Sequence, residues 1–124
     1  MANVLIAEDE TELAETLAEV LGAAGHAVRS SASREGALRT ARGFAVDLLI
    51  SDWALGGSQE GALLVERLRA ERPALRAIVM TGYPSARLRS WVESDDALGV
   101  LEKPFSLSEF RALVARLLGV TAPA

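Results

Sequence analysis

The chain has 124 residues, of which half are apolar and 24% are charged, and this size and composition are typical of one globular domain rather than of a disordered or fibrous protein. The formal net charge is −4 and the 13 basic residues are scattered, so we expect no nucleic acid partner. Cysteine is absent, which excludes disulfides, thiolate zinc sites and cysteine nucleophiles.

The sequence carries no pattern for targeting or for spanning a membrane. The first residues lack a basic stretch followed by an apolar one, and the acids at positions 8–10 interrupt any signal sequence. No apolar run approaches the roughly 18 residues that cross a bilayer. We therefore expect a cytoplasmic protein without membrane contact.

Short apolar runs alternate about five times with longer segments of helical spacing, which is the signature of β-α-β units. The runs that predict strands are 4–7, 27–29, 46–50, 77–80 and 100–101. The first, third and fourth runs are apolar almost throughout, as strands covered by helices on both faces must be. The second and fifth are typical of edge strands.

Helices are predicted after each strand, where apolar residues recur at three- and four-residue steps. These positions centre on 13–24, 37–41, 64–68, 88–92 and 110–118. Gly22 and Gly25 suit the end of the first helix, and Pro84 suits the first turn of the fourth.

The last helix has the clearest start. Ser106 and Glu109 are spaced as a capping box, and Phe105 and Phe110 stand where a hydrophobic staple would close. After this helix the pattern stops, so we expect one domain over 1–119 and a frayed tail at 120–124.

Right-handed crossovers between five parallel strands give a doubly wound α/β sheet, in which ligands bind beyond the carboxyl ends of the strands. Five polar residues lie at or near such ends: Glu8, Asp9, Asp52, Thr81 and Lys103. Each alone is explained by turn solvation or helix capping. Together, three acids, a hydroxyl and an ammonium at one sheet edge indicate a site for a divalent cation and a phosphoryl group.

The acids favour magnesium, because three neighbouring carboxylates repel one another and a small hard cation removes that repulsion. Magnesium takes oxygen ligands and keeps several waters, which leaves room for a phosphate oxygen. A carboxylate that attacks phosphorus yields an acyl phosphate. Lys103 and Thr81 can then contact phosphoryl oxygens, and Gly82 leaves the approach open.

The chain resembles a receiver domain of bacterial two-component response regulators, including those fused to hybrid histidine kinases. The matching segments are VLIAEDE, DLLISDWAL, VMTGY and LEKPF, which occur in order from one end of the chain to the other. The resemblance implies a flavodoxin-like (βα)5 sandwich with strand order 2-1-3-4-5. It also implies that Asp52 is phosphorylated and that Glu8, Asp9, Asp52 and the Ala54 carbonyl bind Mg²⁺.

Further roles follow from the same resemblance. It implies Thr81 as the switch hydroxyl, Lys103 as the cation that contacts the phosphoryl group, and a cis peptide bond before Pro104. The implied partners are a histidine kinase or phosphotransfer protein and a downstream protein that binds residues 84–118, and a homodimer is compatible with it. Such a domain assists its own phosphorylation and dephosphorylation but is not a conventional turnover enzyme.

The sequence departs from the family pattern at two places. Val100 stands where the family usually has an aromatic switch residue, and Tyr83 or Trp91 is a candidate to replace it. Glycines at 56 and 57 stand near the usual proline of the acceptor loop, so we expect a more mobile loop. Trp53 either lines the mouth of the site or covers the sheet edge.

Two other functions remain open. A receiver-like interaction module that works without phosphorylation is suggested by Val100 and Gly56. A phosphohydrolase with an aspartyl nucleophile would need a second acid two residues after the nucleophile, where this chain has Ala54. The sequence leaves open whether the domain is a stand-alone regulator or part of a hybrid kinase.

Overall fold

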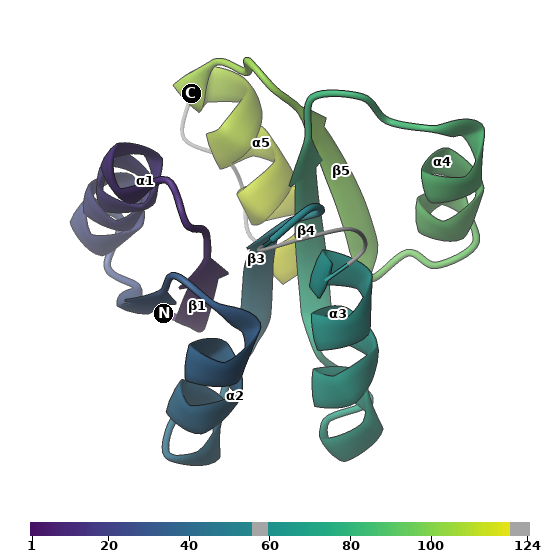
Figure 1. Cartoon of the computed structure of the whole chain (residues 1–124). Coiled ribbons are helices and arrows are strands. Elements are labelled where there is room, and N and C mark those ends of the chain that lie inside the picture. Colours follow the sequence, from purple (N-terminus) through teal and green to yellow (C-terminus); the bar gives the residue numbers. More distant parts are fainter. Residues whose placement is uncertain (56–59, 120–124) are drawn as a thin grey trace.

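A parallel sheet of five strands lies between two layers of helices in a computed structural model that describes residues 1–55 and 60–119 (Figure 1). The elements are β1 Asn3–Ala7, α1 Thr11–Ala23, β2 Ala27–Ser31, α2 Arg34–Arg42, β3 Leu48–Asp52, α3 Glu60–Glu71, β4 Arg76–Thr81, α4 Ala86–Glu93, β5 Leu98–Glu102 and α5 Leu107–Leu118. The expectations for the glycine loop at 56–57 and the tail at 120–124 lie outside the described residues.

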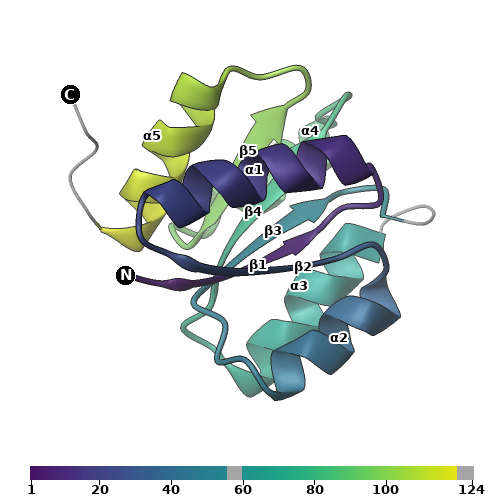
Figure 2. The same cartoon turned by 90° about the vertical axis from the view of Figure 1, so that its left-hand side faces the viewer.

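The strand order is β2-β1-β3-β4-β5 and every pair is parallel, so the predicted topology is confirmed. All five strands therefore end at one edge of the sheet. Figure 2 shows the N-terminus and the end of α5 on the opposite side, from which the strands start. No helix in the described part of the chain is long and apolar enough to cross a bilayer.

The sheet separates two apolar clusters, because successive strand residues face opposite sides. Val4 and Ile6 of β1 pack with α1 and α5, whereas Leu5 packs with α2, α3 and α4. Figure 2 shows α1 and α5 on one side of the sheet and α2 and α3 on the other. Central strands buried on both faces explain the nearly continuous apolar runs in the sequence.

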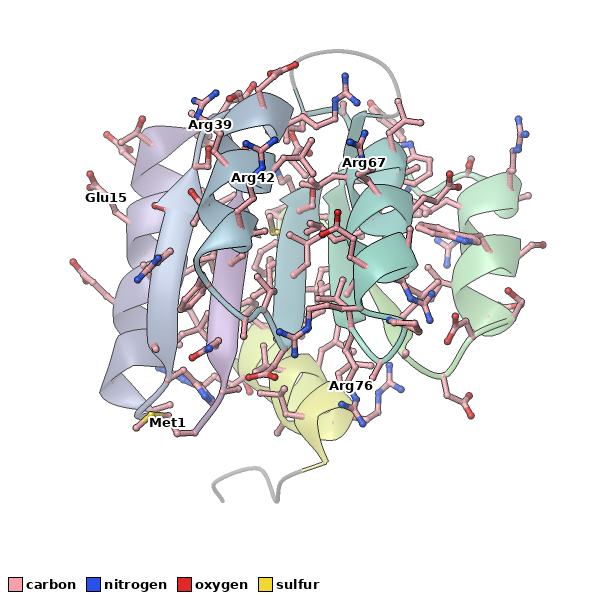
Figure 3. All side chains as sticks on the ribbon, turned by 90° about the horizontal axis from the view of Figure 1, so that it is seen from below. Met1, Glu15, Arg39, Arg42, Arg67 and Arg76 are labelled. Atoms are coloured by element: carbon pink, nitrogen blue, oxygen red, sulfur yellow. The ribbon has the colours of Figure 1, made fainter. Side chains whose placement is uncertain are left out.

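The outer helix faces carry charged side chains, as the amphipathic spacing predicts. Arg39 and Arg42 of α2 and Arg67 of α3 lie on one such exposed face (Figure 3). Arg69 instead pairs with Asp95, with 2.7 Å between Nη1 and Oδ2, which ties α3 to the segment before β5.

The strand β3 lies two residues later than the predicted 46–50, so Asp52 ends the strand rather than following it. The ladder extends this far because Ser51 pairs with Ala7 and Asp52 pairs with Met80. Asp47 directly precedes the strand, and its Oδ2 accepts the N–H of Asn3 at 2.8 Å.

The predicted place of Pro84 in the first turn of α4 is wrong. Ser85 is the N-cap residue and its Oγ accepts the N–H of Leu88 at 3.1 Å, so the helix starts at Ala86, after the proline. At the end of α1, Gly22 lies inside the last turn. Gly25 follows with φ +95°, a conformation that favours glycine and lets the chain turn back into β2.

The start of α5 follows the prediction closely. The Oγ of Ser106 accepts the N–H of Glu109 at 3.0 Å, and the rings of Phe105 and Phe110 stack with centroids 6.1 Å apart. The Glu109 carboxylate returns to the Ser106 hydroxyl at 3.2 Å rather than to its backbone N–H. The staple is therefore present and the capping box is closed through the side chain.

Candidate functional site

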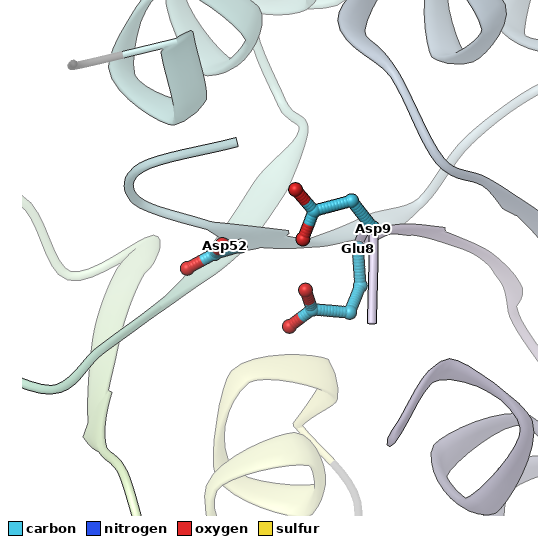
Figure 4. A group of neighbouring side chains, drawn as sticks. All are labelled: Glu8, Asp9 and Asp52. Carbon is cyan, nitrogen blue, oxygen red and sulfur yellow. The ribbon is translucent and has the colours of Figure 1, made fainter. Parts of the chain in front are cut away.

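Three acids converge at the carboxyl edge of the sheet. Glu8 and Asp9 follow β1, and Asp52 ends the neighbouring β3. Each of these residues offers a carboxylate oxygen, and these oxygens all lie within 4.8 Å of one another (Figure 4). Hard oxygen ligands at this spacing fit a small divalent cation such as Mg²⁺.

Glu8 is the buried member of this group, with only 2% of the residue exposed. Its Oε1 accepts a hydrogen bond from Lys103 Nζ at 2.8 Å, and its Oε2 accepts the N–H of Glu10 at 3.1 Å. Burial raises the pKa of Glu8 above its ordinary value, and these two hydrogen bonds offset that rise only in part.

Lys103 lies between the acids. Its Nζ is 2.8 Å from Glu8 Oε1 and 3.6 Å from Asp52 Oδ1. Burial alone would lower the pKa of Lys103, but the hydrogen bond and charge of Glu8, followed by the charge of Asp52, outweigh it and raise the pKa. The lysine is therefore a fixed positive charge beside Asp52 at neutral pH.

The main chain holds this lysine in place. The backbone N–H of Lys103 donates to the Thr81 carbonyl at 2.7 Å, which joins the ends of β4 and β5. The peptide bond between Lys103 and Pro104 is cis, as the sequence resemblance implied.

Thr81 ends β4 next to the acids, since it follows Met80, the partner of Asp52 in the ladder. It is 8% exposed, and its Oγ1 accepts the N–H of Tyr83 at 3.2 Å. A side chain at Gly82 would meet nothing within 4 Å, so the approach from this side is open, as expected.

Ala54 lies in the turn that follows β3. The Leu55 N–H donates to the Asp52 carbonyl at 3.3 Å, which closes this turn, and Leu55 is buried beneath it while Ala54 is exposed. The turn brings the Ala54 backbone close in sequence and space to Asp52. No hydrogen bond is found for its carbonyl among the residues described.

Gly61 supports the turn that follows β3, a role that the sequence alone does not indicate. Its N–H donates to the Trp53 carbonyl at 3.1 Å. A Cβ at Gly61 would collide with the Asp52 carbonyl oxygen and would lie 2.9 Å from the Trp53 Cα. The first turn of α3 therefore packs directly on the backbone that carries Asp52. The sequence does not predict this contact, because Gly61 is one of several glycines close together in the chain.

A second contact that the sequence does not predict joins two aromatic rings. The sequence alone allows the Trp53 side chain either to line the mouth of the site or to cover the sheet edge. It packs against the apolar cluster on the α2–α4 side, and its ring centroid lies 5.9 Å from that of Trp91. The residue thus covers that side of the sheet edge, with its ring directed toward α4.

Comparison with known proteins gives one consistent result. Residues 4–115 match the family of the response regulator receiver domain. The chain is 30% identical over 122 residues to the DNA-binding transcriptional regulator NtrC of Azospirillum brasilense, over 98% of this chain and 25% of that protein. It is 30% identical over 119 residues to the sensor kinase CckA of Brucella abortus, over 94% of this chain and 12% of that protein.

Solved structures agree with this result. The non-phosphorylated HemR receiver domain from Leptospira biflexa superposes with a TM-score of 0.86 at 27% identity, covering 100% of this chain and 99% of that one. The chain spans a quarter or less of the two curated relatives, so their other activities reside in segments that this chain does not match.

Proposed function

Because the chain belongs to the response regulator receiver domain family of two-component systems, we propose that it is a phospho-accepting signalling domain in which Asp52 takes a phosphoryl group from a histidine kinase or phosphotransfer protein. The observation that carries the proposal is the position of Asp52. Its carboxylate lies within 4.8 Å of two further acids and 3.6 Å from a lysine ammonium, at the open edge of the sheet.

In the proposed reaction an Asp52 oxygen attacks phosphorus while the bond between phosphorus and the donor imidazole nitrogen breaks. The electron pair of that bond stays on the nitrogen, and the product is an acyl phosphate. Lys103 moves its hydrogen bonds toward a phosphoryl oxygen, and the Thr81 hydroxyl donates to another. Both side chains already lie at this edge.

Mg²⁺ is the cofactor that we propose for this site. Glu8, Asp9, Asp52 and the Ala54 carbonyl would hold it, the three carboxylates being the cluster already described. When bound, it supplies positive charge that neutralises the phosphoryl oxygens during transfer. The chain itself supplies the nucleophile, the lysine and the threonine.

The downstream partner is proposed to bind α4, β5 and α5 within residues 84–118. Among the relatives, one is named a DNA-binding transcriptional regulator and another a sensor kinase, so both a regulator and a hybrid kinase remain possible settings for such a domain. A homodimer through the same elements is compatible with either setting.

The alternative, a module that works without phosphorylation, is less well supported, because the acids and Lys103 are all in place. The matched family is a receiver domain and not a family of turnover enzymes, and Ala54 leaves a phosphohydrolase without its second acid. The proposed role is therefore signalling rather than turnover.

Incubation with acetyl phosphate and MgCl2, followed by mass spectrometry of the intact protein, tests this function. We expect the wild type to gain the mass of one phosphoryl group and Asp52→Asn to gain none. Ser51→Ala is the matched control and should gain it, because Ser51 is buried and its hydroxyl donates to the backbone carbonyl of Asp52 at 3.1 Å rather than to the carboxylate. A wild type without mass gain, or a gain that survives in Asp52→Asn, would contradict the proposal.

A further inference from the structure

The ring contact between Trp53 and Trp91 connects the acceptor strand with α4. The two planes are tilted by 48° with centroids 5.9 Å apart, which is within the range of favourable aromatic contact. Both residues are half-buried and pack on the same apolar cluster. Trp53, the residue after Asp52, therefore touches a helix that begins 33 residues later at Ala86.

The backbone of Trp53 is held on both sides. Its N–H donates to the Met80 carbonyl at 2.8 Å, and its own carbonyl accepts the N–H of Gly61 at 3.1 Å. Its two chain neighbours are Asp52, the proposed phosphoryl acceptor, and Ala54, whose carbonyl is a proposed metal ligand. The Trp53 backbone is therefore tied to β4 and α3 directly between the two proposed ligand residues.

The residues that could form another connection are poorly placed. Val100 is small and pairs with Val79, two ladder steps before the pair of Thr81 and Glu102. The residue Tyr83 is 91% exposed, so its ring has little packing against the rest of the domain. Of the aromatic residues near the site, Trp53 has the ring that reaches α4.

The helix α4 is held in a way that permits movement. Leu88 is the buried residue of this helix, and the Arg89 to Glu102 ion pair is long, at 3.9 Å, and exposed. Trp91 lines two hollows of about 250 and 370 Å³, and both are also lined by Glu66 of α3. The half-buried indole of Trp91 therefore has open space beside it into which it can move.

We propose that the contact between Trp53 and Trp91 couples the state of Asp52 to the position of α4, in the place of an aromatic switch at position 100. This coupling rests on the proposed phosphorylation of Asp52. Trp53 and Trp91 are then positioning residues. Neither contacts the phosphoryl group, and both determine whether phosphorylation of Asp52 changes the position of α4.

Tryptophan fluorescence tests the coupling, because Trp53 and Trp91 are the two tryptophans of the chain. In Trp53→Phe the aromatic contact is kept and Trp91 is the only tryptophan, so MgCl2 with beryllofluoride, a phosphoryl mimic, should change the tryptophan emission. In Trp53→Leu the ring is lost, and this change should fall by about threefold or more. An equal change in the two variants would overturn the proposal.

Amide spectra of isotopically labelled protein provide the second measurement. Beryllofluoride should shift the amides of Gly82 and Lys103 in the wild type, in Trp91→Phe and in Trp91→Leu, which shows that each variant is folded and binds the mimic. Shifts of residues 86–93 should be retained in Trp91→Phe and reduced in Trp91→Leu. Unchanged shifts of 86–93 in Trp91→Leu would overturn the coupling.

The same spectra distinguish a failure of the coupling from a failure of the proposed function. Wild-type shifts at Gly82 and Lys103 that do not reach residues 86–93 would overturn the coupling and leave Asp52 as acceptor. A wild type without any shift near Asp52 would overturn both, because no phosphoryl mimic would then bind.

Discussion

At the scale of single residues, the ion pair between Glu8 and Lys103 is the most consequential interaction. Glu8 has 1% of its side chain exposed and Lys103 has 26%, so one partner is fully desolvated and the other is not. Removing one partner of a buried pair is more harmful than removing both, because a lone buried charge stays behind. The pair therefore positions the lysine and also lowers the free-energy cost of burying the Glu8 carboxylate.

We expect Lys103→Met to lower the free energy of unfolding by about 2 kcal/mol without magnesium, somewhat below the cost of breaking a fully buried pair. The reason is that Glu8 would lose the donor 2.8 Å from its Oε1. Urea denaturation in a chelating buffer measures the change. The double variant Glu8→Gln with Lys103→Met should recover most of it, and a double variant less stable than Lys103→Met would contradict this account.

His26 gives the domain a pH-dependent contact. Its Nδ1 accepts the N–H of Ala2 at 3.0 Å, and burial, followed by the nearby N-terminal charge, lowers the pKa of His26. The folded state therefore prefers the neutral ring, so this contribution to stability is complete above the unfolded pKa of about 6.5 and is lost as the pH falls through the lower folded value. Stability falls with falling pH because the unfolded chain binds the His26 proton more tightly than the folded protein does.

We expect the urea midpoint of the wild type to fall more than that of His26→Gln between roughly pH 7.5 and 5.5. Glutamine cannot take up a proton and can still offer an acceptor to Ala2. Parallel denaturation series at the two pH values measure the difference. Equal falls in the two proteins would show that His26 does not contribute.

The individual site residues could be found in the sequence, whereas their contacts could not. Polar residues stood out against apolar runs, so Asp52, Thr81 and Lys103 were visible as the ends of strands. The Lys103 to Glu8 bond joins residues 95 positions apart, and its length depends on the packed sheet. The position of the Trp91 ring depends on how α4 is rotated about its axis. Sequence periodicity does not determine that rotation well for an eight-residue helix.

At the scale of elements, α3 is placed by the close approach of Gly61 to the Asp52–Trp53 backbone. Any larger residue must move either the helix start or the acceptor loop, because its Cβ would lie 2.9 Å from the Trp53 Cα. This contact makes the start of α3 part of the support for Asp52.

We expect Gly61→Ala to lower the free energy of unfolding by about 1–3 kcal/mol, as overpacking does, and to slow phosphorylation by acetyl phosphate. Gly22→Ala is the matched control, since Gly22 also lies in a helix but a Cβ there meets nothing within 4 Å. That control should gain up to about 1 kcal/mol from better helix propensity. Similar losses of stability in the two variants would contradict a specific contact at Gly61.

Element boundaries show where local pattern and tertiary structure compete. The apolar run 46–50 was the visible signal, but the ladder with β1 and β4 draws Ser51 and Asp52 into the strand. The sequence pattern alone places Pro84 in the first turn of α4. In the structure the hydroxyl of Ser85 caps the helix, so α4 starts after the proline. The number and alternation of strands and helices followed from periodicity, and the strand order followed from the resemblance to receiver domains. The exact ends of the elements depended on single hydrogen bonds.

At the scale of the whole molecule, the proposed Mg²⁺ site at the acidic edge predicts that stability depends on divalent cations. We expect MgCl2 to raise the free energy of unfolding by about 1.4 kcal/mol at ten times its dissociation constant, because it binds the folded state alone. Asp9→Asn should weaken this dependence, since it removes one of the three carboxylates. An equal rise produced by NaCl at matched ionic strength would show ordinary screening instead.

The return of α5 along the sheet has a practical consequence for attaching other molecules to this domain. All strands point toward the acidic edge, and α5 starts beside Lys103 and carries the chain back about 18 Å over its 12 residues. The N-terminus and the end of α5 therefore lie on the side opposite the acidic edge (Figure 2). A tag, a surface anchor or a fused protein at either end should leave the acidic edge free to meet a phosphodonor.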